Sequence, residues 1–231
     1  LQFITETHIF MMYILLCTIS ATWTFLGVQN SRVADPQPEL FSIQNRDERL
    51  RLIKDPGIMA VLLGIFLYGV GYGVFMTSIP NYMSSLTLSN HNLSGLTFIA
   101  FYIGITLAQF IGGPIADNKG RLVPMLGGLF LYSICMLVFF HASSFTSLLI
   151  LFVASFSLGL FLVGSIPFLN DQAGQYSKGF TSGLFYFFWG GGYFLGPIIL
   201  GYAGKYNSYP IGFSTIGMSG IVITFLIIFT R

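Results

Sequence analysis

Charged side chains are scarce in this sequence. Lys, Arg, Asp and Glu make up 8% of its 231 residues, whereas soluble globular domains carry about 25%. In addition, 54% of the residues are hydrophobic and the mean hydropathy is +0.78. Because a soluble domain of this size needs a charged surface, the composition excludes soluble enzymes and nucleic-acid-binding proteins. It predicts a membrane protein.

Cysteine is also rare, and both Cys17 and Cys135 lie within apolar stretches. A free cysteine in such a position usually behaves as a small apolar side chain. We therefore expect neither a disulfide nor a cysteine metal site, and the sequence indicates no metal and no cofactor.

The few charged residues leave five long charge-free stretches, and together these have room for seven membrane-spanning helices of about 20 residues each. The stretches are Thr7–Ser31, Pro56–Ala116, Leu122–Asn170, Gly179–Gly204 and Tyr206–Thr230. Two polar segments, Pro80–Ser94 and His141–Ser147, divide the two longest of them. The predicted spans are His8–Val28, Gly57–Ile79, Gly95–Pro114, Leu122–Phe140, Leu148–Phe168, Phe180–Ala203 and Ser208–Phe229. The predicted fold class is an all-α membrane protein.

The positions of Lys and Arg predict the orientation, because cytoplasmic loops carry an excess of them. Seven spans place nine of the ten basic residues on one side and leave only Lys205 on the other. We therefore expect a multi-pass protein of the cell membrane with a cytoplasmic C-terminus. The chain opens at Leu1 without a basic segment before its first span, which predicts an internal start rather than a signal peptide.

A polar linker, residues 29–56, separates the first span (residues 1–28) from a unit of six spans (residues 57–231). We expect Asp35–Pro38 to be extended and Gln44–Lys54 to form a surface helix whose basic side faces anionic lipid. A regulatory or partner-binding role is the alternative. In the six-span unit, Gln109–Ile115 and Tyr193–Ile198 share a Gly-Pro-Ile pattern, which predicts two related three-helix units.

The most specific motif runs from Gly113 to Arg121, between the third and fourth spans. We expect Gly113 to allow close approach of a neighbouring helix and Gly120 to allow a tight turn. Asp117 at the membrane face needs a partner, either Arg121 or the N-terminus of an adjacent helix. Such a pair is either a gate that holds one conformation closed or a positive anchor that only sets topology.

A second motif, Gly192-Tyr-Phe-Leu-Gly196-Pro197-Ile-Ile-Leu-Gly201, lies in the sixth span. Small residues four apart allow backbones to pack closely, and a proline bends a helix. The segment is therefore either a helix-packing surface or a hinge.

These motifs resemble those of the major facilitator superfamily (MFS) of secondary transporters. Its loop signature, G-x-x-x-D-[RK]-x-G-R-[RK], matches at Gly113, Asp117, Gly120 and Arg121 but departs at Asn118 and Leu122. Pro80-x-Tyr82 and the segment from Lys178 to Gly183 also match the family pattern. The resemblance implies that spans two to seven form the C-terminal 3+3 bundle and that span one is the last helix of an N-terminal half otherwise missing from this chain. The linker would then be the central cytoplasmic loop.

No charged residue or histidine lies at the centre of any predicted span, where proton relays and coupling sites usually occur. His8, His91 and His141 all lie at the predicted outer face. If protons are the coupling ion, we therefore expect the coupling acid in the missing half. The wall of the substrate cavity would be neutral and aromatic, suited to lipophilic or amphiphilic small molecules. Its candidate residues are Tyr68, Tyr72, Tyr102, Thr106, Ser157, Tyr186, Trp189 and Tyr193, each of which has interfacial or packing roles as the alternative.

Three classes of protein fit seven spans. A membrane-embedded enzyme requires intramembrane His, Asp or Ser constellations that this chain lacks. A seven-span receptor-like or non-transporting protein fits the topology but has no use for the Gly113–Arg121 motif. We therefore expect a secondary transporter that works by alternating access, not an enzyme. The Gly192–Pro197 pattern resembles the G-x-x-x-G-P motif of the family's antiporters, which belongs to the fifth helix of the other half, so this segment is its pseudo-repeat counterpart. Drug:proton antiport is one form of transport that the resemblance suggests.

Overall fold

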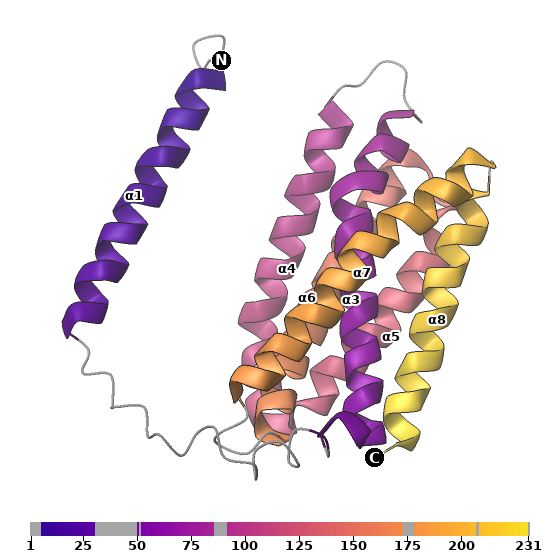
Figure 1. The fold of residues 1–231 in the computed structure, drawn as a ribbon. Coiled ribbons are helices and arrows are strands. Elements are labelled where there is room, and N and C mark those ends of the chain that lie inside the picture. Colours follow the sequence, from indigo (N-terminus) through magenta and orange to yellow (C-terminus); the bar gives the residue numbers. More distant parts are fainter. Residues whose placement is uncertain are drawn as a thin grey trace. The chain divides into compact units, whose positions relative to one another are not determined.

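The computed structural model describes residues 6–30, 50, 52–85, 92–172, 178–206 and 208–230, and its regular secondary structure there is entirely α-helical (Figure 1). The chain divides into two units, Leu1–Ser42 and Ile43–Arg231. The first unit contains helix α1 (Glu6–Asn30), at the position of the first predicted span. Residues Met11–Gly27 of this helix form an apolar stretch.

The second unit is a bundle of six helices, each long and apolar enough to cross a membrane. They are α3 (Pro56–Ser85), α4 (Asn92–Lys119), α5 (Leu122–Phe139), α6 (Ser144–Gln172), α7 (Lys178–Lys205) and α8 (Tyr209–Phe229). Every predicted span of residues 57–231 therefore corresponds to a helix. The all-α prediction is confirmed.

Two helix ends differ from the prediction, and both involve proline. Helix α3 continues through Pro80 as far as Ser85, so this part of the predicted loop is helical. Helix α4 likewise runs through Pro114 to Lys119, so most of the Gly113–Arg121 motif is helical rather than a loop. A proline removes only one helical hydrogen bond. In an apolar environment without water, the remaining backbone groups have no better partners than those of the helix.

Most of the polar linker lies outside the described residues, including Asp35–Pro38. Of the predicted surface helix, only Leu50 and Leu52–Lys54 are described, and they are helical. Helix α3 then begins at Pro56, as predicted, and Asp55 caps it. The Ile58 amide donates a hydrogen bond of 2.9 Å to Asp55 Oδ1, which satisfies one of the unpaired amides of the first turn.

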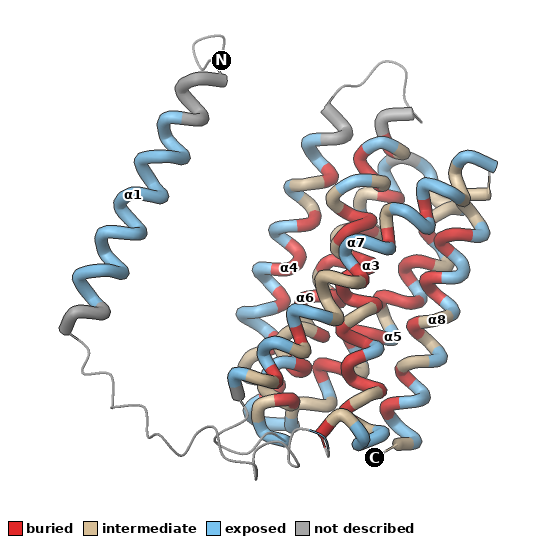
Figure 2. The backbone as a smooth tube through the Cα atoms, in the orientation of Figure 1, coloured by how far each residue is buried: buried red, intermediate tan, exposed pale blue. Residues whose placement is uncertain are grey.

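The helices pair in the reciprocal manner of a 3+3 repeat. Helix α3, the first of one triplet, packs along α7, the middle helix of the other; α6 and α4 form the corresponding pair. The third helices, α5 and α8, pack against each other. Figure 2 shows the buried positions concentrated along α3 and the inner faces of its neighbours. The internal repeat expected from a few shared residues thus agrees with the helix pairing.

Small residues make the two principal pairings unusually close. A Cβ added to Gly69 or Gly73 of α3 would meet the backbone of α7, and one added to Gly192 or Gly196 would meet the backbone of α3. The α4–α6 pair is built in the same way from small residues at Gly104, Ala108, Ser155 and Gly159. Lipid provides little hydrophobic drive for helix association, so such close van der Waals packing is a main source of stability in the bundle.

Candidate functional site

Three helix ends meet through an ion-pair triad at Arg121. Arg121 Nη1 lies 2.6 Å from Asp117 Oδ1, and Arg121 Nε lies 3.5 Å from Asp171 Oδ2. Asp117 belongs to the end of α4, Arg121 precedes α5, and Asp171 belongs to the end of α6. Of the two partners expected for Asp117, the structure therefore shows Arg121. We call this end of the bundle the Arg121 end.

The turn that presents Arg121 depends on Gly120. Gly120 has φ +89°, a conformation that residues with a Cβ rarely adopt, and it is the only glycine of the described residues with positive φ. Only Gly120 and Arg121 separate α4 from α5, so the tight turn is confirmed. Gly113 differs from expectation, because no atom of the described residues lies within 4 Å of an added Cβ there. The neighbouring Gly112 faces Leu160 of α6 instead.

The triad is a surface feature. The side chains of Arg121, Asp117 and Asp171 are 34%, 69% and 61% exposed. Hydrogen bonding to the Asp117 carboxylate raises the pKa of Arg121, so the guanidinium stays charged. Exposed ion pairs contribute little to stability, because water and salt screen them. The triad is therefore suited to setting the positions of three helix ends rather than to stabilising the bundle as a whole.

Asp171 was not among the residues expected from the sequence. The sequence offered one signal for Asp171: the predicted orientation placed the end of the fifth span on the same side as Arg121. What the sequence does not reveal is that α4 and α6 pack side by side, which brings their ends to the same Arg121.

Aromatic residues from three helices gather around Tyr72 of α3. Its ring centroid lies 5.8 Å from Trp189 and 6.0 Å from Tyr193, both of α7, and 5.0 Å from Phe101 of α4. The cluster extends from Tyr72 to Tyr68, from Phe101 to Tyr102, and from Trp189 to Tyr186. The structure thus brings together six of the eight cavity candidates. Phe101 completes the cluster and was not expected.

The two hydroxyl candidates lie apart from the rings. Thr106 is exposed on α4 and lines an open hollow of about 250 Å³ together with Tyr102, Ile103 and Leu107. Ser157 is fully buried, and its hydroxyl donates to the Val153 carbonyl at 2.6 Å. Within the cluster, the buried indole Nε1 of Trp189 has no hydrogen-bond acceptor among the described residues.

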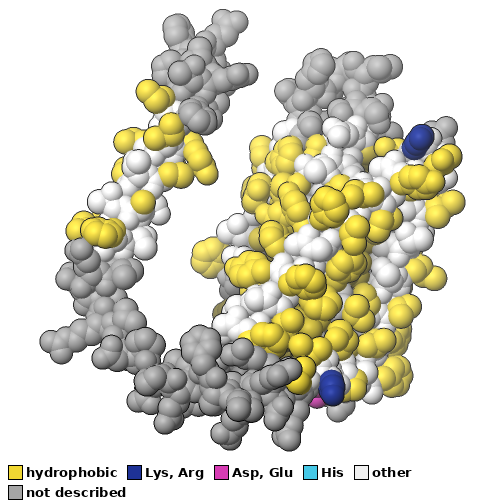
Figure 3. Space-filling view, viewed as in Figure 1, with side chains coloured by type: hydrophobic (Ala, Val, Ile, Leu, Met, Phe, Trp, Pro, Cys, Tyr) yellow, Lys and Arg dark blue, Asp and Glu magenta, His cyan; other side chains and the backbone are white. Residues whose placement is uncertain are grey.

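Helices α4 and α7, which both contribute to the cluster, are each buried on one face and exposed on the other. In their most apolar stretches, 28% and 22% of the residues are buried, against 78% in α3. Figure 3 shows many hydrophobic side chains on this face, with the coloured basic side chains at its two ends. Large exposed side chains include Tyr102 and Phe110 of α4 and Tyr186, Phe187 and Phe194 of α7. The aromatic cluster therefore borders a broad apolar surface.

A family model described as "Major Facilitator Superfamily" matches residues 61–231. The chain belongs to this family. Similar curated proteins include the "Multidrug resistance protein MdtG" of Salmonella paratyphi C (strain RKS4594), which is 30% identical over 172 residues. The protein of the same name from Enterobacter lignolyticus (strain SCF1) is 27% identical over 174 residues. These alignments cover 72% and 73% of this chain and 42% of each relative, so the chain spans less than half the length of these relatives.

The Gly192–Gly201 segment of α7 is divided between two environments. Gly192 and Gly196 contact the backbone of α3, as the packing interpretation predicts, whereas no atom of the described residues lies within 4 Å of a Cβ at Gly201. Helix α7 continues through Pro197 as far as Lys205. A hinge at this segment stays a prediction. The part that contains Gly192 and Gly196 would have to move together with α3.

Proposed function

We propose that this chain contributes the C-terminal six-helix bundle of a secondary transporter for small lipophilic or amphiphilic solutes. The observation that carries the proposal is the aromatic cluster around Tyr72, which is uncharged and borders the exposed face of α4 and α7. Aromatic rings accept apolar and cationic molecules without demanding one hydrogen-bonding pattern. Family membership supports transport, and the name of the similar proteins, multidrug resistance protein, supports efflux.

Transport would proceed by alternating access. The bundle would rock against an N-terminal six-helix partner seated on the apolar face of α4 and α7, and the solute would bind between the two bundles. The Arg121 end would face the cytoplasm. Any proton coupling would reside in the partner bundle, since residues 56–116, 122–170, 179–204 and 206–230 carry no Asp, Glu, Lys or Arg. The receptor-like alternative draws no support from the family match.

The Asp117–Arg121–Asp171 triad would act as the cytoplasmic gate. All three residues belong to one bundle, so the triad would hold the ends of α4, α5 and α6 in a single arrangement that the closed gate requires. A weak, exposed ion pair is suited to a gate, because it biases a conformational equilibrium without locking it.

The cluster is tested by efflux of a fluorescent lipophilic cation from cells that express the full-length protein. Trp189→Leu removes the central ring of α7 and should reduce efflux several-fold while membrane levels stay unchanged. Phe229→Leu, at an exposed position remote from the cluster, is the matched control and should transport normally. Sugar counterflow that lipophilic cations do not inhibit would refute the proposed solute class.

The gate is tested with Asp117→Ala, which should abolish most transport while the protein still reaches the membrane. Lys119→Ala alters a neighbouring charge outside the triad and serves as the control. Asp117→Glu, which keeps a carboxylate beside Arg121, should retain part of the activity if pairing is what matters. Unchanged efflux in Asp117→Ala would refute the gate but leave the solute class untouched.

A further inference from the structure

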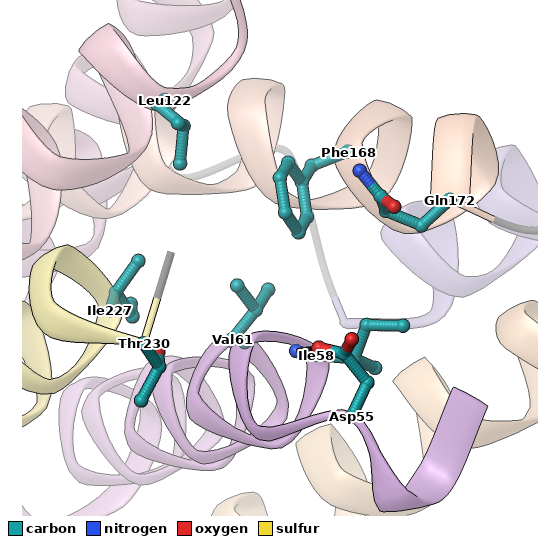
Figure 4. A pocket seen from close by; sticks show the side chains of 9 residues that line it. Asp55, Ile58, Val61, Leu122, Phe168, Gln172, Ile227 and Thr230 are labelled. Carbon is teal, nitrogen blue, oxygen red and sulfur yellow. Dashed lines mark hydrogen bonds between the residues drawn. The ribbon is translucent and has the colours of Figure 1, made fainter. Parts of the chain in front are cut away.

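A second cavity lies at the Arg121 end, away from the aromatic cluster. It has a volume of about 210 Å³ and is bounded by the start of α3, the start of α5, and the ends of α6 and α8 (Figure 4). Figure 4 shows the Phe168 ring pointing into this space opposite Val61, with Leu122 and Ile227 beside it. Because drug-sized ligands occupy roughly 300–1,000 Å³, this cavity fits a compact molecule.

The one full charge among the described lining residues of the cavity is negative. It belongs to Asp55, and Gln172 lies on the same side of the space (Figure 4). The helix ends contribute partial charges of both signs: the end of α8 at Ile227 and Thr230 is partly negative, whereas the starts of α3 and α5 are partly positive. These partial charges oppose one another, so the Asp55 carboxylate sets the sign of the cavity.

Asp55 can serve a ligand without giving up its structural role. Its Oδ1 accepts the hydrogen bond from the Ile58 amide that caps α3, and the second carboxylate oxygen is geometrically separate from this bond. The capped amide does not neutralise the carboxylate. The cavity therefore combines one carboxylate, one aromatic face and aliphatic walls, which together favour a compact organic cation.

We propose that this cavity binds a small quaternary or alkylated ammonium group. The cation would lie against the Phe168 ring, with Asp55 as its counter-charge and the aliphatic walls around its methyl groups. The proposal does not depend on the proposed transport function, because the cavity is formed entirely by the Arg121 end of this bundle.

The occupied cavity would also restrict the helix ends around it. Leu122 follows Arg121 and Gln172 follows Asp171, so two lining residues are direct neighbours of the triad. A cation that contacts α3, α5, α6 and α8 binds only while these helix ends lie together, so it stabilises this arrangement over one in which they separate. Binding should therefore raise the denaturation temperature in proportion to ligand occupancy.

The probe for this site is choline, and its control is 3,3-dimethylbutan-1-ol, in which carbon replaces the charged nitrogen. Binding to the purified full chain in lipid nanodiscs is measured by titration calorimetry and by saturation-transfer NMR. Asp55→Asn removes the charge but retains an equally good N-cap, so the fold is preserved. Phe168→Leu retains an apolar side chain without the ring. Glu6→Gln makes the same change of net charge in α1, outside the described lining of the cavity.

We expect choline to bind at least about fivefold more weakly to Asp55→Asn and about threefold more weakly to Phe168→Leu. Glu6→Gln should bind it as the unsubstituted chain does, and the neutral alcohol should bind weakly to every variant. Equal binding of choline and the alcohol, equal loss in Asp55→Asn and Glu6→Gln, or no choline binding at all would overturn the proposal. Equal denaturation temperatures of the ligand-free variants confirm that folding is unaffected.

Discussion

Gly192→Ala tests the reciprocal glycine contact between α7 and α3. The added Cβ would meet the Phe66 carbonyl oxygen and would lie 2.9 Å from both the Phe66 carbonyl carbon and the Val70 nitrogen. Ordinary contacts of a Cβ lie at 3.4–4 Å. All three obstructing atoms belong to the backbone of α3, so no side-chain rotation can relieve the clash.

The two helices must therefore move apart by at least about 0.5 Å along the contact, a lower bound set by the 2.9 Å separations. Overpacking of this kind costs about 1–3 kcal/mol. Alanine recovers up to about 1 kcal/mol through its higher helix propensity. We expect a net loss of about 1–2 kcal/mol, with a further loss of van der Waals contact at Gly69 and Gly196, which belong to the same interface.

Gly201→Ala is the matched control, because it makes the same substitution in the same helix where no described atom lies within 4 Å. Thermal and chemical denaturation of both variants in the same detergent measures the difference, and Gly69→Ala combined with Gly192→Ala should be non-additive because the helices separate only once. Equal stability of Gly192→Ala and Gly201→Ala would refute the packing geometry. Reduced efflux in Gly201→Ala with unchanged stability would instead support a hinge near the C-terminal end of α7.

Three further predictions concern the Arg121 end. Gly120→Ala forces a Cβ into φ +89° and should cost about 1–2 kcal/mol of stability, measured by denaturation against the neutral control Gly127→Ala, where no described atom lies within 4 Å. Arg121→Lys keeps the charge but loses the fork that reaches two carboxylates, so efflux should fall although the denaturation temperature stays nearly unchanged; normal efflux would mean that charge alone suffices. Asp55→Ala removes the N-cap of α3 and should lower stability by about 0.5–2 kcal/mol, whereas Asp55→Asn should not; equal losses in the two would contradict the cap.

Local sequence signals were sufficient for the helices and for the turn at Gly120. Long apolar stretches without charge have one stable form in lipid, and a glycine between two helices one residue from Arg121 has an evident conformational role. Helix ends were less predictable, because Pro80 and Pro114 are usual signs of termination in water. Here the helices continue past both, since the remaining backbone hydrogen bonds have no competitor.

The sequence by itself determined that this is a helical membrane protein, which of the connections between its spans carry the basic residues, and that its spans carry no central charge. Only the tertiary structure decided which residues meet. Asp171 reaches Arg121 because α4 and α6 pack together, six aromatic candidates converge on Tyr72, and Ser157 is buried elsewhere. The physical reason is that hydropathy along one helix specifies burial in lipid but not the neighbour it packs against. Shape matching between small residues on different helices makes that choice, and it is a property of pairs that no single stretch of sequence contains.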